Sequence, residues 1–157
     1  MDSSFWINKW QAGEIGFHLP QVHPLLEKYS QQIFGQGQKV FVPLCGKTID
    51  MRYLSDQGHS VLGVELCEIA AQSFFEEQFQ QSVEAESISD DFDAYVLHDI
   101  KIIVGDFFKL PQPLEGFNVI YDRAALIALP SDIRQRYVEN LKQLCPTANM
   151  ILITLRL

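Results

Sequence analysis

The chain has 157 residues, of which 47% are apolar and 20% are charged, the composition of an ordinary globular protein. Its 12 lysines and arginines and 20 aspartates and glutamates give a formal net charge of −8, and no basic cluster stands out. Nucleic acid and anionic membrane surfaces are therefore disfavoured as partners. A chain of this length is expected to form a single domain over residues 1–157 with a sizeable core.

The three cysteines also bear on where the protein works. Cys45, Cys67 and Cys145 are scattered, odd in number and outside any CxxC pair, which favours free thiols in a reducing compartment over a disulfide framework or a zinc site. The N-terminus lacks a charged head followed by an apolar run, and no apolar stretch reaches membrane-spanning length. We expect a cytoplasmic protein without a membrane partner or a bound metal.

Residues 1–19 are rich in aromatic side chains and contain Gly13 and Gly16, a pattern that favours irregular structure. The rings belong to Phe5, Trp6, Trp10 and Phe17. So much apolar area favours burial over a free tail. Two interpretations stand: a flap packed on the core, or a lid that covers a ligand and supplies rings for stacking. Next, residues 20–24 open a predicted helix that runs to about Phe34, with Pro24 suited to its first turn and an apolar face of Leu25, Leu26, Tyr29 and Ile33. For His23, beside its start, a surface position is favoured over metal binding.

Residues 39–66 read as strand, tight turn, helix and strand. The run Val40 to Leu44 predicts a buried parallel strand that ends at Cys45-Gly46, and Thr48 or Asp50 is expected to cap the next helix. Gly58 ends that helix, and a second strand at residues 61–64 has Glu65 at its carboxyl end. Doubly wound folds hold a nucleoside in this way, with a glycine turn near the ligand and a carboxylate for the ribose hydroxyls.

This glycine signal is weak by itself. PLCGK has one glycine where a dinucleotide fingerprint has three, which argues against a nicotinamide-dependent oxidoreductase. The alternative is any α/β domain with a turn at Gly46 and a solvated Glu65.

The rest of the chain continues the α/β alternation. Helices are predicted at residues 68–80 and 131–144, strands at 95–97, 100–104, 117–121 and 149–155, and a polar surface insertion at 81–92. Asp106 follows a strand and has two interpretations, a group that reads an adenine edge or a turn aspartate beside core phenylalanines. Asp122 and Arg123 follow the next strand. Arg123 suits either an anionic ligand or a surface ion pair. Strand ends of such sheets meet at one ligand-binding edge.

Five segments resemble the thiopurine S-methyltransferase family. They are FWINKWQAGEIGFH at 5–18, VFVPLCGKTIDM at 40–51, GHSVLGVEL at 58–66, VGDFFKL at 104–110 and YDRAALIALP at 121–130. They stand in the family's order across the whole chain, and the spacing W-x3-W-x6-FH followed by PLCGK is specific. The resemblance implies a class I, Rossmann-like α/β fold with a mostly parallel sheet and helices on both faces. It also implies S-adenosyl-L-methionine as cofactor and methyl transfer to the sulfur of a small aromatic or heterocyclic thiol.

The resemblance further implies roles for single residues. Trp10 and Leu44 would line the cofactor pocket, Glu65 would accept the ribose hydroxyls, and Asp106 and Phe107 would lie against the adenine. Arg123 would stand beside the methionine end of the cofactor and the substrate, and Phe17 would border the substrate. No catalytic residue is assigned, because an acidic thiol is largely ionised near neutral pH and needs no strong base.

One departure matters. Family members continue beyond the fifth strand with an antiparallel pair and further substrate-site residues, whereas this chain stops at Leu157. We therefore expect a truncated product whose last strand exposes one edge and promotes self-association. The alternatives to a thiopurine-type enzyme are a cofactor-binding fragment with little turnover and a related thiol, halide or selenium-compound methyltransferase.

Overall fold

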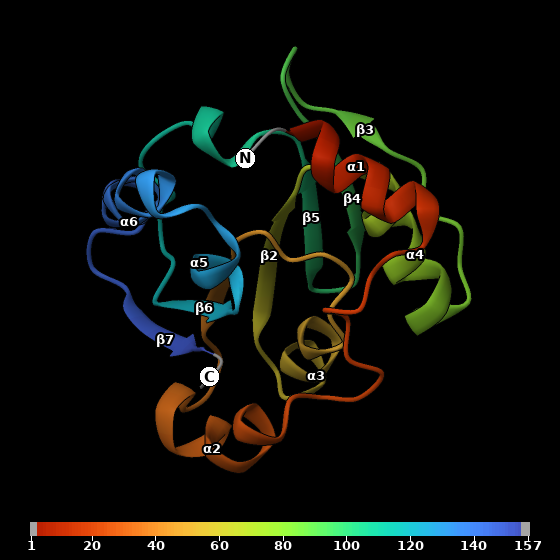
Figure 1. Ribbon diagram of the computed structural model, residues 1–157. Helices are drawn as coiled ribbons and strands as arrows, with labels where there is room; N and C mark the ends of the chain where they lie inside the picture. The colour runs from red at the N-terminus through yellow and green to blue at the C-terminus, as the bar shows by residue number, and fades with distance from the viewer. Residues whose placement is uncertain (1–2, 155–157) are drawn as a thin grey trace.

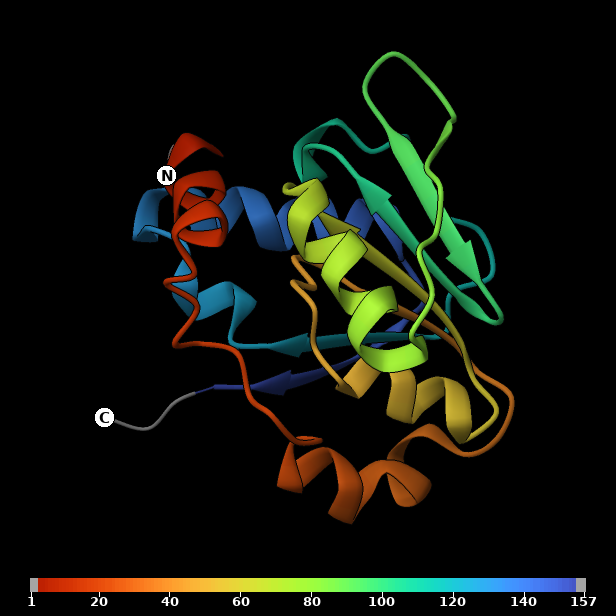
Figure 2. The same ribbon diagram turned by 90° about the vertical axis from the view of Figure 1, so that its right-hand side faces the viewer.

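The structure is a computed structural model that describes residues 3–154 (Figures 1 and 2). Within these residues, seven strands form one sheet in the order β3-β4-β5-β2-β1-β6-β7. The strands are β1 Lys39–Val42, β2 Ser60–Glu65, β3 Glu86–Ser87, β4 Asp93–Leu97, β5 Ile100–Val104, β6 Val119–Arg123 and β7 Asn149–Ile153. The helices are α1 Ser3–Ala12, α2 Pro24–Phe34, α3 Asp50–Asp56, α4 Glu68–Phe79, α5 Ala125–Ala128 and α6 Ser131–Leu144.

The sheet is mostly parallel, as predicted. β5, β2, β1, β6 and β7 run parallel to one another, with Val40 of β1 opposite Val61 of β2 and Val119 of β6. β4 pairs antiparallel with the outer edge of β5, and the two-residue β3 pairs antiparallel with β4. The carboxyl ends of the parallel strands therefore lie along one edge of the sheet.

Helices cover both faces of this sheet (Figure 1). Val40 and Val42 of β1 face the core under α2, α3 and α4, whereas Phe41, between them, faces the core under α5 and α6. All three side chains are buried, because the period of two along a strand sends an unbroken apolar run to both faces. The Rossmann-like α/β prediction is confirmed.

The expectation of irregular structure near the N-terminus was wrong between Ser3 and Ala12, which form α1. Trp6 and Trp10 are four residues apart, the spacing that places two side chains on one helix face. Trp10 is buried in a small cluster with Cys67 and with Ala70 of α4. The aromatic residues that suggested irregular structure include Trp6 and Trp10, which lie on one face of a helix.

Several boundaries differ from the prediction. β1 ends at Val42, so that Leu44 lies in the turn, and β6 extends through Arg123. The short helix α5 was not predicted. β3 lies in the stretch expected to be a plain insertion. The strand predicted to end at residue 155 ends at Ile153, and residue 155 lies outside the described residues.

The buried face of α2 and the starts of α2 and α3 also differ from the prediction. On α2 the buried residues are Leu26, Ser30 and Phe34, and the expected apolar face at Leu25, Tyr29 and Ile33 is largely exposed. His23 has a structural role rather than a plain surface position, since its Nδ1 accepts a hydrogen bond from the Leu25 N–H and caps α2. Before α3, the Thr48 hydroxyl accepts the N–H of Asp50 at 3.2 Å, whereas the Asp50 side chain points elsewhere.

None of the helices in the described part of the chain combines the length and hydrophobicity needed to cross a lipid bilayer.

Candidate functional site

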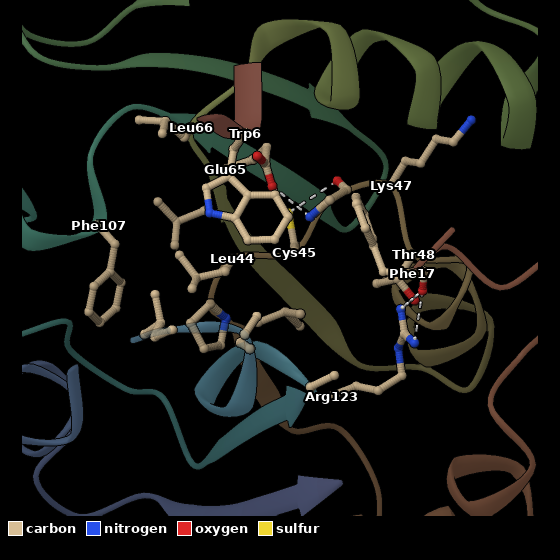
Figure 3. Close-up of a pocket in the computed structure, with 18 of the residues that line it drawn as sticks. Trp6, Phe17, Leu44, Cys45, Lys47, Thr48, Glu65, Leu66, Phe107 and Arg123 are labelled. Atoms are coloured by element: carbon tan, nitrogen blue, oxygen red, sulfur yellow. Dashed lines mark hydrogen bonds between the residues drawn. The ribbon is translucent and has the colours of Figure 1, made fainter. Parts of the chain in front are cut away.

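The carboxyl ends of β5, β2, β1 and β6 border a pocket of about 440 Å³ (Figure 3). Ligands bind at this edge in open α/β sheets, and the volume is in the range of small-molecule sites. α1 and the segment that follows it close one side of the pocket. Every residue to which the resemblance gave a site role lines it: Trp10, Phe17, Leu44, Glu65, Asp106, Phe107 and Arg123. Asp122, expected at the same edge, is not among the lining residues.

The turn after β1 forms the floor of the pocket. Leu44 and Gly46 both have left-handed backbone conformations, with φ of 50° and 55°. A side chain at Gly46 would place its Cβ 3.3 Å from Cζ2 of Trp10, so glycine allows both the φ angle and the close approach of the indole. Such strain in Leu44, a non-glycine residue, is typical of positions that surrounding structure holds for function.

Glu65, at the end of β2, is clamped by this turn. Its Oε2 accepts the Gly46 N–H at 2.7 Å, and its Oε1 accepts the Cys67 N–H at 3.3 Å. The side chain is buried, and burial raises the pKa of Glu65 while the hydrogen bonds from Gly46 and Cys67 oppose that rise. Because the two carboxylate oxygens together can accept about four hydrogen bonds, acceptor capacity is left for a ligand.

Asp106 and Phe107 lie beyond the end of β5. The Asp106 carboxylate accepts the Phe108 N–H at 2.9 Å and caps a single 3₁₀ turn at Phe107–Lys109. The Phe107 ring is buried, with its centroid 5.2 Å from that of Tyr137 and 6.4 Å from that of Phe41. The turn-aspartate interpretation therefore holds, and both residues still line the pocket.

Arg123, at the end of β6, stands at the opposite end of the pocket from Phe107 (Figure 3). Its guanidinium donates two long hydrogen bonds, of 3.4 and 3.5 Å, to the carbonyl oxygen of Phe17. Its Nε lies 3.8 Å from Oδ2 of Asp50, which is 1% exposed. The ion pair of Arg123 is therefore with a buried carboxylate rather than at the surface. The hydrogen bonds of Arg123 to Phe17 connect the segment after α1 to the sheet.

Asp50 is the centre of a buried network that sequence reasoning missed. Its Oδ1 accepts the His23 N–H at 2.8 Å, and its Oδ2 accepts the Tyr121 hydroxyl at 2.7 Å. One carboxylate thus joins the start of α2, the first turn of α3, β6 and Arg123. Asp122, beside it on β6, faces the other way and accepts the Tyr137 hydroxyl at 2.6 Å and the Ala125 N–H at 2.8 Å.

Aromatic rings from the N-terminal segment form one wall of the pocket. Phe17 packs edge-on against Trp6 and Trp10, with centroid distances of 5.7 and 5.5 Å. Trp6 escaped the sequence prediction, although its spacing from Trp10 was a usable signal. His18 and Lys47 also line the pocket unpredicted; they follow Phe17 and Gly46 directly in the chain.

The pocket is built for binding rather than for covalent catalysis. Cys45 is its thiol, and burial together with Glu65 raises the pKa of Cys45 well above the usual value, so the sulfur stays protonated. Among residues 3–154, no group of three or more His, Cys, Asp or Glu side chains is arranged to hold a metal ion.

The Thiopurine S-methyltransferase family model matches residues 1–157. The chain belongs to the thiopurine S-methyltransferase family. It is 46% identical over 158 residues to the thiopurine S-methyltransferase of Shewanella loihica and 43% identical over 158 residues to that of Xanthomonas axonopodis pv. citri. Each alignment covers 99% of this chain and 72% of the relative. The family resemblance of the sequence motifs is confirmed.

Solved structures with the same fold are methyltransferases of low sequence identity. A Burkholderia thailandensis 1,6-didemethyltoxoflavin-N1-methyltransferase with bound S-adenosylhomocysteine is 14% identical, with a TM-score of 0.68 over 96% of this chain and 59% of the other. A TehB-like methyltransferase from Corynebacterium glutamicum is 19% identical, with a TM-score of 0.58 over 96% of this chain and 71% of the other. These likenesses show the class I methyltransferase fold.

A member of this family is a methyltransferase, and its cofactor is S-adenosyl-L-methionine, as the resemblance implied. The residues present fit that cofactor. The Glu65 carboxylate keeps acceptor capacity beyond its backbone hydrogen bonds, which suits a ribose hydroxyl. The aromatic wall and the turn at Leu44 supply apolar surface of the kind that surrounds bound ligands.

The network around Asp50 leads to a stability prediction. Tyr121→Phe removes a 2.7 Å hydrogen bond to a buried carboxylate and should lower the free energy of unfolding by about 1.5–3 kcal/mol. Tyr53→Phe is the matched control, because it removes a 3.1 Å hydrogen bond to the Ser30 hydroxyl and should cost about 1 kcal/mol. Urea unfolding of both variants makes the comparison. Equal costs would show that Asp50 is not a stabilising centre.

Proposed function

We propose that this methyltransferase acts on the sulfur of a small aromatic or heterocyclic thiol of the thiopurine type. The order of groups along the pocket supports the proposal best. Asp106 and Phe107 follow β5, Glu65 ends β2, Leu44 follows β1 and Arg123 ends β6, and these strands are neighbours in that order. In this order, the strand ends would place Asp106 and Phe107 at an adenine, Glu65 at a ribose, Leu44 at a sulfonium and Arg123 at an anionic acceptor.

On the cofactor side, Glu65 accepts hydrogen bonds from the ribose hydroxyls, which suits a carboxylate already held by two N–H groups. Asp106 and Phe107 lie against the adenine, and Trp10 and Leu44 enclose the middle of the ligand. Arg123 extends to the methionine end. The left-handed backbone of Leu44, with a φ of 50°, gives this turn a defined shape, so the turn itself needs little ordering on binding.

On the substrate side, Phe17 borders the thiol ring and Arg123 favours its anionic form. The sulfonium of the cofactor supplies an activated methyl group. The thiolate sulfur provides the electron pair of the new S–CH₃ bond while the bond between that methyl and the sulfonium breaks. The protein aligns the two sulfurs and excludes water, and the positive charge of Arg123 lowers the pKa of a thiol placed beside it.

Residues 3–19 form the lid of this site, and residues 1 and 2 of the segment expected to do so lie outside the described residues. The support is that Trp6, Trp10, Phe17 and His18 line the pocket, while Phe17 stays 40% exposed and Gly13 has a φ of 72°. The Arg123 contact to Phe17 joins the lid to the sheet through hydrogen bonds longer than 3.3 Å, which suits a reversible closure.

The unpaired edge of β7 supports self-association. Within residues 3–154, β7 pairs with β6 alone, and Met150 and Leu152 are 40% and 43% exposed. An apolar strand with open donors and acceptors is a template for a second copy. Light scattering over a concentration series should show dimers or larger species, and a monomer at every concentration would contradict this.

Two alternatives are open to test. The first alternative is a chain that binds the cofactor with little turnover. It is relevant because the chain spans 72% of the length of the relatives described above. A related activity on other soft nucleophiles, such as halides or selenium compounds, uses the same bond changes. The purified chain, given S-adenosyl-L-methionine, should methylate 6-mercaptopurine faster than iodide or a selenide. Bound S-adenosylhomocysteine without any methylated product would favour the first alternative, and the opposite substrate order the second.

The Glu65 role predicts a specific loss of affinity. Glu65→Ala should weaken S-adenosylhomocysteine binding by roughly 1.5–3 kcal/mol in calorimetry, the usual worth of hydrogen bonds to a charged group. Glu86→Ala, on the exposed strand β3, is the control and should leave the affinity unchanged.

The same role predicts a pH dependence. Protonation of Glu65 removes acceptor capacity, so affinity should be full above the raised pKa of Glu65 and should fall as the pH falls through it. Glu65→Gln should lack this dependence. A wild-type affinity that stays constant from neutral to acid pH would count against the ribose assignment.

The lid predicts a ligand-dependent change in backbone protection. Amide hydrogen exchange between residues 6 and 17 should slow when S-adenosylhomocysteine is added, because closure orders the segment. Exchange in β2 should change little, apart from residues at its carboxyl end. Identical protection of the segment with and without ligand would show a fixed wall instead of a lid.

A further inference from the structure

The imidazole of His18 lies in the pocket without a hydrogen-bond partner. His18 follows Phe17 and is half-buried among the residues that line the substrate end. Within residues 3–154, neither ring nitrogen donates or accepts a hydrogen bond and the ring makes no ion pair. By contrast, Nδ1 of His23 and Nδ1 of His59 each accept a backbone N–H group. His18 thus has both nitrogens available to a ligand.

The backbone around His18 is held at the end of β6. The His18 N–H donates to the Ile15 carbonyl at 2.9 Å and closes a turn. The preceding carbonyl, that of Phe17, accepts the two hydrogen bonds from Arg123. Arg123 itself is anchored beside the buried Asp50. This chain of contacts places the imidazole next to the two residues proposed to border the substrate.

The surroundings keep this imidazole uncharged at neutral pH. Burial is the main cause that lowers the pKa of His18 below 6.5, and the cations of Lys47, after β1, and Arg123, on β6, act in the same direction. Glu77 on α4 and Asp50 on α3 oppose them. Their effect on the pKa of His18 is reduced, because Glu77 forms an ion pair with Lys47 at 2.7 Å and Asp50 accepts the Tyr121 hydroxyl. A neutral imidazole has a free lone pair with which to accept a proton.

We propose that His18 is a catalytic residue that accepts the proton of thiols too weakly acidic to ionise at neutral pH. The substrate class then extends from acidic aromatic thiols to benzylic and alkyl thiols. The S–H bond breaks as an N–H bond forms on the imidazole. The freed electron pair forms the S–CH₃ bond as the bond between that methyl and the cofactor's sulfonium breaks and leaves a neutral thioether, and the imidazolium later returns its proton to water. This inference rests on the proposed function, which covers acidic thiols by itself.

The test compares two thiols in one assay. 4-Nitrothiophenol is ionised at pH 7, whereas benzyl mercaptan is protonated. His18→Gln should lower kcat/KM for benzyl mercaptan about 100-fold more than for 4-nitrothiophenol, since a general base contributes at least this factor. His98→Gln, in the turn between β4 and β5 outside the pocket, is the matched control. The wild-type rate with benzyl mercaptan should decrease as the pH is lowered through the pKa of His18. The His18→Gln variant should lack this decrease.

Nitrogen-15 NMR of the imidazoles gives a readout that does not depend on turnover. The His18 signals, identified by their loss in His18→Gln, should titrate below 6.5 and should shift when benzyl mercaptan is added with S-adenosylhomocysteine. Equal losses for the two thiols, no loss for either, or signals that ignore the thiol would overturn the inference. Methylation of 4-nitrothiophenol alone by the wild type would also overturn it and leave the proposed function standing. Methylation of neither thiol would overturn the proposed function itself.

Discussion

The pocket depends on one buried carboxylate held by backbone N–H groups. Glu65 ends β2, and the turns after β1 and β2 bend around it so that Gly46 and Cys67 each donate to one of its oxygens. Removing a carboxylate from water is costly, and hydrogen bonds from N–H groups offset that cost. The arrangement keeps an acceptor at the centre of the strand-end edge. It also explains why Gly46 must approach the sheet and Trp10 so closely.

A second buried carboxylate organises the end of the pocket at Arg123, where we propose that the substrate binds. Asp50 receives the Tyr121 hydroxyl and the His23 N–H, and it lies beside Arg123. Partners from α2, α3 and β6 thus set where the guanidinium stands. Because Arg123 in turn holds the Phe17 carbonyl, the position of the segment after α1 is coupled to the core of the sheet. In the proposed function, Glu65 serves the cofactor side of the pocket, and Asp50 supports the substrate side through Arg123.

Local patterns made much of this predictable. The unit from β1 through α3 to β2 follows from a short apolar run, a glycine turn and a second apolar run, and strand ends of a parallel sheet meet at one edge. The motifs added the family and the identity of every predicted pocket residue. α1 was missed because its many rings and the following glycines suggested irregular structure. The four-residue spacing of Trp6 and Trp10, which indicates a helix face, was not used. Asp50 was beyond local reasoning, since Tyr121 lies 71 residues away and only the folded sheet brings them together. The left-handed backbone of Leu44 likewise has no side-chain signature.

The central claim is that the order of the strand ends sets the order in which the cofactor is held, with Glu65 at the ribose. The most direct measurement is a crystal structure of the chain with S-adenosylhomocysteine. The account predicts both ribose hydroxyls within hydrogen-bonding distance of the Glu65 carboxylate, the adenine beside Asp106 and Phe107, and the sulfur facing Phe17 and Arg123. A ligand whose ribose hydroxyls point away from Glu65, or one that runs along the strand ends in the reverse direction, would contradict it.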